Sequence, residues 1–249
     1  MALTLMLSLS LVMVATAFLS GVFGMAGGLV LIGLLLALLP LPEAMALHAI
    51  TQMASNGWRG LLWWRHVRWR ATGFFIAGSV LALGVWTIWR WVPPKPVAML
   101  LLGVTPFLVR LVPSGLQPEP ENPVQGGLYG ALCMTLMLLT GVSGPLLDTF
   151  FLGGGLDRRQ IVATKAVCQV FGHATKLFYF SAVIDQAASV NPVMALLAVA
   201  MSMLGTSLAR PVLDRLSDTQ YRTWATHIIT VIACYYVAHG TWLLMRGVV

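Results

Sequence analysis

The sequence predicts an all-α polytopic membrane protein made of two inverted repeats, each with a glycine-broken first helix, a short half-helix and three further helices. Of its 249 residues, 58 % are hydrophobic and 9 % are charged, whereas soluble domains carry about 25 % charged residues. Apolar runs follow one another along the whole chain. At about 20 residues per crossing, they allow roughly eight to ten segments. The order of these runs in the first half recurs in the second, which indicates an internal repeat.

The first half, residues 1–112, is predicted to form the N-terminal transmembrane repeat. Its apolar runs cover residues 3–20, 29–39, 43–64, 71–89 and 96–112. The first run ends at the glycine-rich stretch Gly21–Gly28, and the second is too short for an untilted crossing. The third run carries polar residues spaced by four, three and four positions, which places them on one helical face: His48, Gln52, Ser55 and Arg59.

The second half, residues 126–249, is predicted to repeat this plan after a polar linker at residues 113–125. Its runs cover residues 126–140, 146–152, 157–180, 192–209 and 223–245. The break here is Gly141–Pro145, the run after it is again short, and the third run is again polar. Aligned by eye, three pairs of residues correspond: Thr51 with Thr164, Gln52 with Lys165, and Asn56 with Gln169.

Basic residues predict the topology. If every run crosses or dips once, nine arginines share one side: Arg65, Arg68, Arg70, Arg110, Arg158, Arg159, Arg210, Arg215 and Arg222. Arg90, Lys95 and Arg246 lie on the other side. This bias is typical of a cytoplasmic side and places both termini outside. Counting each broken pair as one crossing makes the halves parallel and puts basic loops on both sides. Whether the short runs 29–39 and 146–152 cross fully stays open.

The net charge of +7 is attributed to cytoplasmic loops and the anionic lipid surface, because no basic cluster is long enough for a nucleic-acid site. Cys133, Cys168 and Cys234 lie inside apolar runs without a close pair, so no metal site, cofactor or disulfide is expected. The expected location is a bacterial inner membrane, as a multi-pass protein in contact with lipid. A monomer and a homo-oligomer are both compatible with the sequence.

The two breaks predict a binding site. Helix ends inside a membrane are tolerated where they line a buried or water-filled site, and paired breaks in inverted halves point to the binding site of a transporter. Half-helix N-termini offer free N–H groups and positive dipole ends to an anion, and glycine lets a ligand approach the backbone. The alternative is close packing of helices through small residues, which also explains the spacing of Gly24 and Gly28.

The run 157–180 carries Lys165, Gln169, His173 and Lys176 close to one stripe. A charge at mid-bilayer costs about 2.5–3.5 kcal/mol on insertion scales, so such residues usually face a cavity or a partner. The stripe therefore predicts a pocket or path for an anion, and the alternative is that both lysines snorkel to the interfaces. Lys176 lies near the end of the run, whereas Lys165 lies too deep in it for its side chain to reach the membrane interface easily.

The predicted substrate-binding residues come from both breaks and both polar runs: Gly24, Gly27, Gly28, Thr51, Gln52, Asn56, Arg59, Ser143, Gly144, Thr164, Lys165, Gln169 and His173. Two further residues are candidates for proton coupling. Asp148 would take up a proton or pair with Lys165 or Arg59. His48 would relay a proton or only form hydrogen bonds.

The first break, GVFGMAGG at Gly21–Gly28, resembles the glycine-rich first segment of the sulfite exporter TauE/SafE family. Ala49–Thr51, the basic aromatic loop after it, and the recurrence at Gly141–Gly144 followed by Ala163–Thr164 fit the same family over essentially the whole chain. Two features depart from it: Pro145–Asp148 replaces further glycine, and Gln52 and Lys165 follow the threonines where a serine is often found. The resemblance implies a secondary transporter of small sulfur-containing anions such as sulfite, sulfoacetate or related sulfonates, working by alternating access between the repeats.

Two other functions stay open. Gly141-Val142-Ser143-Gly144 fits the GxSG pattern of an intramembrane serine protease, with His173, His227 and His239 downstream as candidate bases. Against this function, the break at Gly141–Gly144 has a counterpart at Gly21–Gly28 with no serine between its glycines, and a catalytic site would not require such a counterpart. The second of these alternatives is a non-transporting membrane scaffold.

Overall fold

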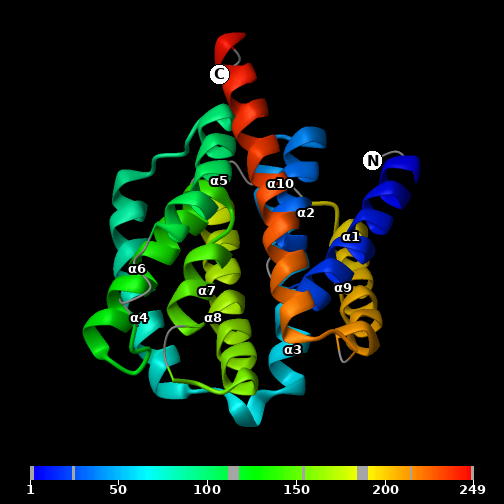
Figure 1. Ribbon diagram of the computed structural model, residues 1–249. Helices are drawn as coiled ribbons and strands as arrows, with labels where there is room; N and C mark the ends of the chain where they lie inside the picture. The colour runs from blue at the N-terminus through cyan, green and yellow to red at the C-terminus, as the bar shows by residue number, and fades with distance from the viewer. Residues whose placement is uncertain are drawn as a thin grey trace.

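The computed structural model describes residues 3–23, 26–111, 118–152, 155–183, 190–213 and 215–247, and within these ranges it contains helices and no strand. Figure 1 shows them as one bundle. The elements of the first half are α1 (Leu3–Phe23), α2 (Ala26–Leu38), α3 (Leu41–Leu62), a 3₁₀ turn η1 (Trp64–His66), α4 (Trp69–Trp89) and α5 (Lys95–Arg110). Those of the second half are α6 (Pro123–Thr140), α7 (Gly144–Leu152), α8 (Arg158–Phe178), a π turn η2 (Tyr179–Val183), α9 (Pro192–Leu213) and α10 (Asp218–Met245). The predicted all-α fold is confirmed.

Local sequence signals set the ends of several helices. The side chain of Asn122 caps α6 by accepting hydrogen bonds from the N–H groups of Val124 and Gln125. Asp157 forms a capping box with Gln160 at the start of α8, so polar side chains satisfy N–H groups that a helix start leaves free. Gly141 ends α6 with φ +84°, a left-handed conformation that favours glycine. The second break is therefore a true helix end.

Five helices in the described part of the chain are long and apolar enough to cross a membrane: residues 6–23, 69–89, 123–140, 192–209 and 226–245. This confirms a multi-pass membrane protein. The helices α3 and α8 are similarly long, with 22 and 21 residues, but they are too polar to meet the same criterion. They pack against each other, so two polar helices share one interface inside an otherwise apolar bundle.

The packing order is unchanged when the first five helices are exchanged with the last five. Helix α1 packs on α9 as α6 packs on α4, and α2 contacts α10 as α7 contacts α5. The same exchange replaces α3 by α8 and α5 by α10, so the contacting pairs α3–α8 and α5–α10 each remain the same pair. A two-fold relation between the halves requires this pattern. The inverted orientation of the halves across a membrane, and the repeat boundaries at 112 and 126, stay predictions.

Two equivalent helix crossings are built on glycine. A Cβ added to Gly78 on α4 would lie 1.8 Å from the carbonyl oxygen of Gly127 on α6. In the other crossing, a Cβ added to Gly205 on α9 would lie 2.3 Å from the carbonyl oxygen of Val14 on α1. At both crossings the backbones approach so closely that only a glycine fits. Small residues at such contacts are typical of membrane helix pairs.

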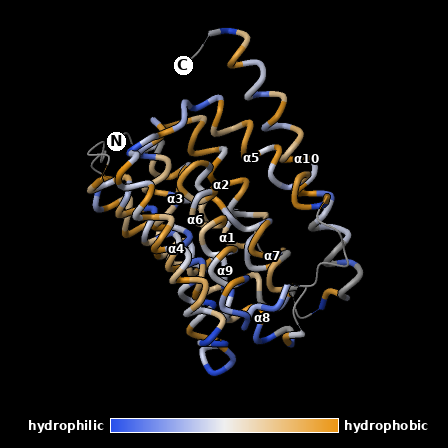
Figure 2. Tube along the Cα trace, turned by 90° about the vertical axis from the view of Figure 1, so that its left-hand side faces the viewer, coloured by the Kyte–Doolittle hydropathy of each residue, from blue (hydrophilic) through white to orange (hydrophobic). Residues whose placement is uncertain are grey.

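The ends of the bundle differ in polarity. The start of α1 and the end of α10 lie toward one end, and the turn between α3 and α4 forms the opposite tip (Figure 1). Figure 2 shows this tip as hydrophilic, in agreement with Arg65, Arg68 and Arg70 nearby. Arg68 Nε donates to Glu121 Oε1 at 2.7 Å, which ties the tip to the described end of the predicted linker.

This arrangement gives a labelling prediction. In a variant with the exposed Cys234 replaced by serine, Arg65→Cys and Arg215→Cys should react with a membrane-impermeant maleimide from the cytoplasmic side only. Both loops lie on the side that carries the excess of arginine. Arg246→Cys, at the end of α10, is the matched control and should react from the other side only. Labelling of the two loops from opposite sides would contradict the inverted-repeat prediction.

Candidate functional site

The polar stripe of α8 divides into two environments. Toward its start, Lys165 forms an ion pair with Asp148 of α7, and 17 % and 21 % of the two side chains are exposed. Toward its end, Lys176 is fully buried, with 0 % of its surface exposed. The two lysines lie eleven positions apart, about 16 Å along a helix. They therefore belong to different sites.

Lys176 is the centre of a buried hydrogen-bonded chain. Its Nζ lies 2.8 Å from Nδ1 of His48 and 2.9 Å from the carbonyl oxygen of Gly141. Nε2 of His48 lies 3.0 Å from the carbonyl oxygen of Gly28. A carbonyl only accepts, so Nε2 of His48 carries the hydrogen and Nδ1 accepts from Lys176.

This chain joins the two helix breaks. Gly28 lies in the first turn of α2, directly after the first break, and Gly141 ends α6 at the second. The connection runs from the Gly28 carbonyl through His48 of α3 and Lys176 of α8 to the Gly141 carbonyl. The two breaks therefore meet at the interface of the two polar helices, from which the sequence also predicts a site.

Two buried polar groups near this chain have no hydrogen-bond partner. His173 packs edge-on against His48, with ring centroids 5.3 Å apart, and its Nδ1 has no hydrogen-bond partner. Nε2 of Gln52 also has none, and the side chain of Gln52 borders Gly28, where an added Cβ would lie 3.3 Å from its Oε1. Both residues are buried, 1 % and 5 % exposed. Since more than about 90 % of buried polar groups are paired in proteins, two unpaired polar groups near a buried lysine point to a ligand.

No carboxylate among the described residues lies against the amine of Lys176. In the described ranges of the chain, the ion pairs of acidic residues are Arg68–Glu121 and Lys165–Asp148, and neither reaches Lys176. The polar neighbours of its Nζ are a neutral imidazole and a carbonyl oxygen. A buried cation is usually paired, so this arrangement suits an anion that arrives from outside.

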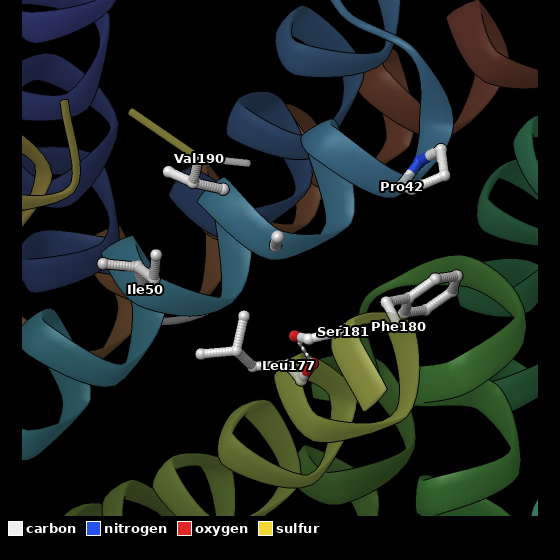
Figure 3. Close-up of a pocket in the computed structure, with 7 residues that line it drawn as sticks. Pro42, Ile50, Leu177, Phe180, Ser181 and Val190 are labelled. Carbon is white, nitrogen blue, oxygen red and sulfur yellow. Dashed lines mark hydrogen bonds between the residues drawn. The ribbon is translucent and has the colours of Figure 1, made fainter. Parts of the chain in front are cut away.

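Two adjoining cavities open beside α3 and α8. The first, of about 180 Å³, lies between Pro42, Ala46 and Ile50 of α3 and Leu177 at the end of α8, with Phe180, Ser181 and Val190 completing its wall (Figure 3). The second, of about 440 Å³, shares Val190 and reaches Glu43 and Asn191. The first wall is mostly apolar and includes Leu177, which directly follows Lys176 in sequence. We interpret these cavities as an approach to the buried chain from the end of the bundle that carries the termini.

Several predicted site residues make contacts within the protein. Thr51 Oγ1 donates to Leu47 O within α3, and Asn56 Nδ2 donates to Gln52 O. Arg59 Nη2 donates to Ser20 O at 3.1 Å, which ties α3 to α1. Thr164 Oγ1 accepts from the N–H of Arg68 at 3.0 Å, which ties α8 to the cytoplasmic turn predicted above. The first two bonds lie within α3, the last two connect separate elements, and none of the four includes Lys176.

Among the predicted site glycines, one serves helix packing and another belongs to the Lys176 chain. An added Cβ at Gly27 would lie 1.9 Å from the carbonyl oxygen of Thr16, so this glycine serves the close packing of α2 on α1 that was the alternative expectation. Gly28 instead offers its carbonyl to His48. Gly144 is the first residue of α7, and Gln169 is half-buried on α8. Gly24 lies outside the described residues.

Ser143, the nucleophile of the protease alternative, is buried. In the part of the chain that the structure describes, no histidine hydrogen-bonds it. The nitrogens of His48 are bonded to Gly28 and Lys176 instead. A serine nucleophile needs a base within hydrogen-bond reach, so the described geometry favours a structural role for Ser143.

Sequence reasoning placed the charge of the site at Lys165, and the structure adds Lys176. Two signals in the sequence indicated it. Lys176 follows His173 by three positions, so both lie on one face of α8, and His48 occupies the matching polar run of the first half. The proximity of His48 to Lys176 required the packing of α3 on α8, which the sequence pattern alone does not fix.

The ion pair of Lys165 gives a second prediction. Lys165→Met should lower the melting temperature, because it leaves the carboxylate of Asp148 in a half-buried site without its partner. Asp148→Asn in the same chain should restore most of the loss, and the coupling between the two changes is measured by a double-mutant cycle. Affinity for an anion should change little. Additive losses of stability would show that Lys165 and Asp148 do not stabilise each other. An anion affinity that falls with Lys165→Met alone would show that Lys165 serves the substrate.

Comparison with known proteins gives one match. The family model of the sulfite exporter TauE/SafE family matches residues 9–236. No curated protein and no solved structure matches the chain.

Proposed function

The chain belongs to the sulfite exporter TauE/SafE family, and we propose that it is a secondary transporter of a small sulfur-containing anion in a bacterial inner membrane. Sulfite, sulfoacetate and related sulfonates are the proposed substrates. Transport proceeds by alternating access around a site between the two halves. The family is one of membrane transporters and not of enzymes, in line with the predicted absence of catalysis.

One observation carries the proposal: a fully buried lysine, without a carboxylate partner among the described residues, lies where the two helix breaks meet. Burying an unpaired cation is costly, and intramembrane ionisable residues usually mark substrate or ion pathways. A protein gains nothing in stability from such a residue. An anionic substrate supplies the missing charge.

The neighbouring donors fit an oxygen-rich anion. Lys176 provides the charge, while the unpaired donor groups of Gln52 and His173 supply further hydrogen bonds if the Nδ1 of His173 carries the hydrogen. A sulfite or sulfonate group presents three oxygens, so it accepts from several directions at once. Gln52 and His173 belong to the predicted substrate site, and Lys176 joins them as its proposed cation.

The exchange symmetry of the packing supports alternating access. The site lies between α3 and α8, which form one of the two helix pairs that exchange into themselves. Repeats of this kind rock against each other around a site at their interface in many transporters. In the described conformation the Lys176 chain is closed, and the adjoining cavities lie toward the termini.

The test is flux into proteoliposomes that contain the purified protein. Radiolabelled sulfite should be taken up, and unlabelled sulfoacetate and ethanesulfonate should compete, with taurine and sulfate as comparison compounds. Empty liposomes and the Lys176→Met variant are the controls. Absence of flux for every compound, together with cleavage of a model transmembrane substrate, would favour the protease. Absence of both activities would favour the scaffold.

A further inference from the structure

Resting on the proposed function, the geometry points to Lys176 as the group that couples proton and anion. We propose that Lys176 takes up one proton together with one monovalent anion and releases both on the other side of the membrane. The sequence suggested Asp148 and His48 for proton coupling. The structure engages Asp148 with Lys165 and both nitrogens of His48 in the buried chain.

The count of hydrogen bonds at Lys176 supports this coupling. The protein supplies two acceptors, Nδ1 of His48 and the carbonyl oxygen of Gly141. A neutral amine has two N–H donors, and these two acceptors pair both of them. An ammonium group has three donors, and the described residues supply no third acceptor. An anion oxygen is the acceptor that the third N–H lacks, and that N–H exists only when the proton is bound.

The charge balance leads to the same step. With 0 % of Lys176 exposed, a lone ammonium or a lone anion in this site would be a buried unpaired charge, which is costly. Together they form a neutral pair. The step adds H⁺ to the amine and places the anion beside the new ammonium, and no bond of the anion breaks.

The surroundings of Lys176 leave few other proton acceptors. His48 of α3 faces it, and a proton on Nδ1 of His48 would remove the acceptor that Lys176 uses. His173 of α8 is the rival acceptor, because its Nδ1 has no partner. The breaks at α2 and α6 present carbonyl oxygens. Two charged groups of neighbouring elements are engaged elsewhere: Asp148 of α7 binds Lys165, and Arg90, directly after α4, binds the carbonyl of Val183.

The test measures protons taken up when the purified full-length protein binds ethanesulfonate in weakly buffered detergent solution with a pH indicator. Ethanesulfonate stays ionised throughout the range, so any proton taken up is bound by the protein. We expect about one proton per bound anion. Above neutral pH, the affinity should fall about tenfold per pH unit, as linkage to one proton requires. Lys176→Arg keeps a permanent charge and should bind the anion without proton uptake or pH dependence.

His173→Gln is the matched variant. It should weaken anion binding, because His173 belongs to the proposed site, but should keep about one proton per bound anion. Binding by the wild type without proton uptake would overturn the coupling and leave the proposed function intact. Uptake per bound anion that persists in Lys176→Arg, or disappears in His173→Gln, would assign the proton to a histidine and overturn the role of Lys176. If the wild type binds neither ethanesulfonate nor sulfite, the proposed function fails, and this inference fails with it.

Discussion

Lys176→Met should abolish anion transport while leaving the melting temperature equal to or above that of the wild type. Methionine keeps most of the side-chain volume and removes a buried amine whose charged form lacks a carboxylate partner among the described residues. Replacing buried ionic groups by apolar residues of similar volume is often neutral or stabilising. Losing one partner of a buried charge-assisted contact costs a ligand about 2–5 kcal/mol. Anion affinity should therefore fall at least about thirtyfold.

Lys165→Met is the matched control, since it makes the same change on the same helix. It should show the opposite result, with a lower melting temperature and nearly unchanged affinity, because Lys165 is bound to Asp148. Affinity for ethanesulfonate and melting temperature are measured for both variants. Normal flux in Lys176→Met would refute the assignment of Lys176 to the substrate. A variant that loses both stability and flux would show that Lys176 holds the two breaks together.

Much of the fold was predictable because the membrane restricts it. The predicted runs coincide with helices α1 to α10 to within a few residues, since each backbone polar group in lipid must be satisfied within a helix. The breaks at Gly141 and before α2 were predicted from glycine content, and the positive φ of Gly141 shows why that residue is needed. Helix existence and order follow from local chemistry.

The partners of polar residues were less predictable. Whether Lys165 pairs with Asp148 or faces a substrate depends on how α7 lies against α8. The sequence was compatible with either role. Lys176 illustrates the same point, because its burial depends on Gly141 of α6 and His48 of α3 approaching from other parts of the chain. Contacts between helices distant in sequence are not determined by the periodicity of either helix alone.

Two neighbouring glycines, Gly27 and Gly28, also have different roles, one in helix packing and one in the site. Gly27 belongs to a backbone contact, where an added Cβ would lie 1.9 Å from Thr16 O. Gly28, its direct neighbour, meets only the side chain of Gln52 at 3.3 Å and offers its carbonyl to His48. Loss of activity in a Gly27 variant would therefore report on folding, and Gly28→Ala is the informative probe of the site.

The glycine with the largest expected effect on folding is Gly78, where α4 crosses α6. Gly78→Leu should prevent the two helices from docking, because the added Cβ would lie 1.8 Å from the backbone oxygen of Gly127, and backbone in a helix cannot move aside as a side chain can. Overpacking of a core costs about 1–3 kcal/mol and occasionally more. The contact also carries the hydrogen bond from Ser79 Oγ to the carbonyl of Gly130, which would be lost.

Gly84→Leu supplies the control on the same helix, since no atom lies within 4 Å of the position that its Cβ would occupy. Its leucine would face the exterior of the bundle, where lipid accepts an apolar side chain. Both variants are scored by yield of monodisperse protein in detergent and by melting temperature. Gly78→Leu should be recovered poorly and melt early, and Gly84→Leu should behave like the wild type. A well-folded Gly78→Leu would mean that α4 and α6 tolerate a wider separation, and that the equivalent crossing of α1 and α9 at Gly205 need not be tight either.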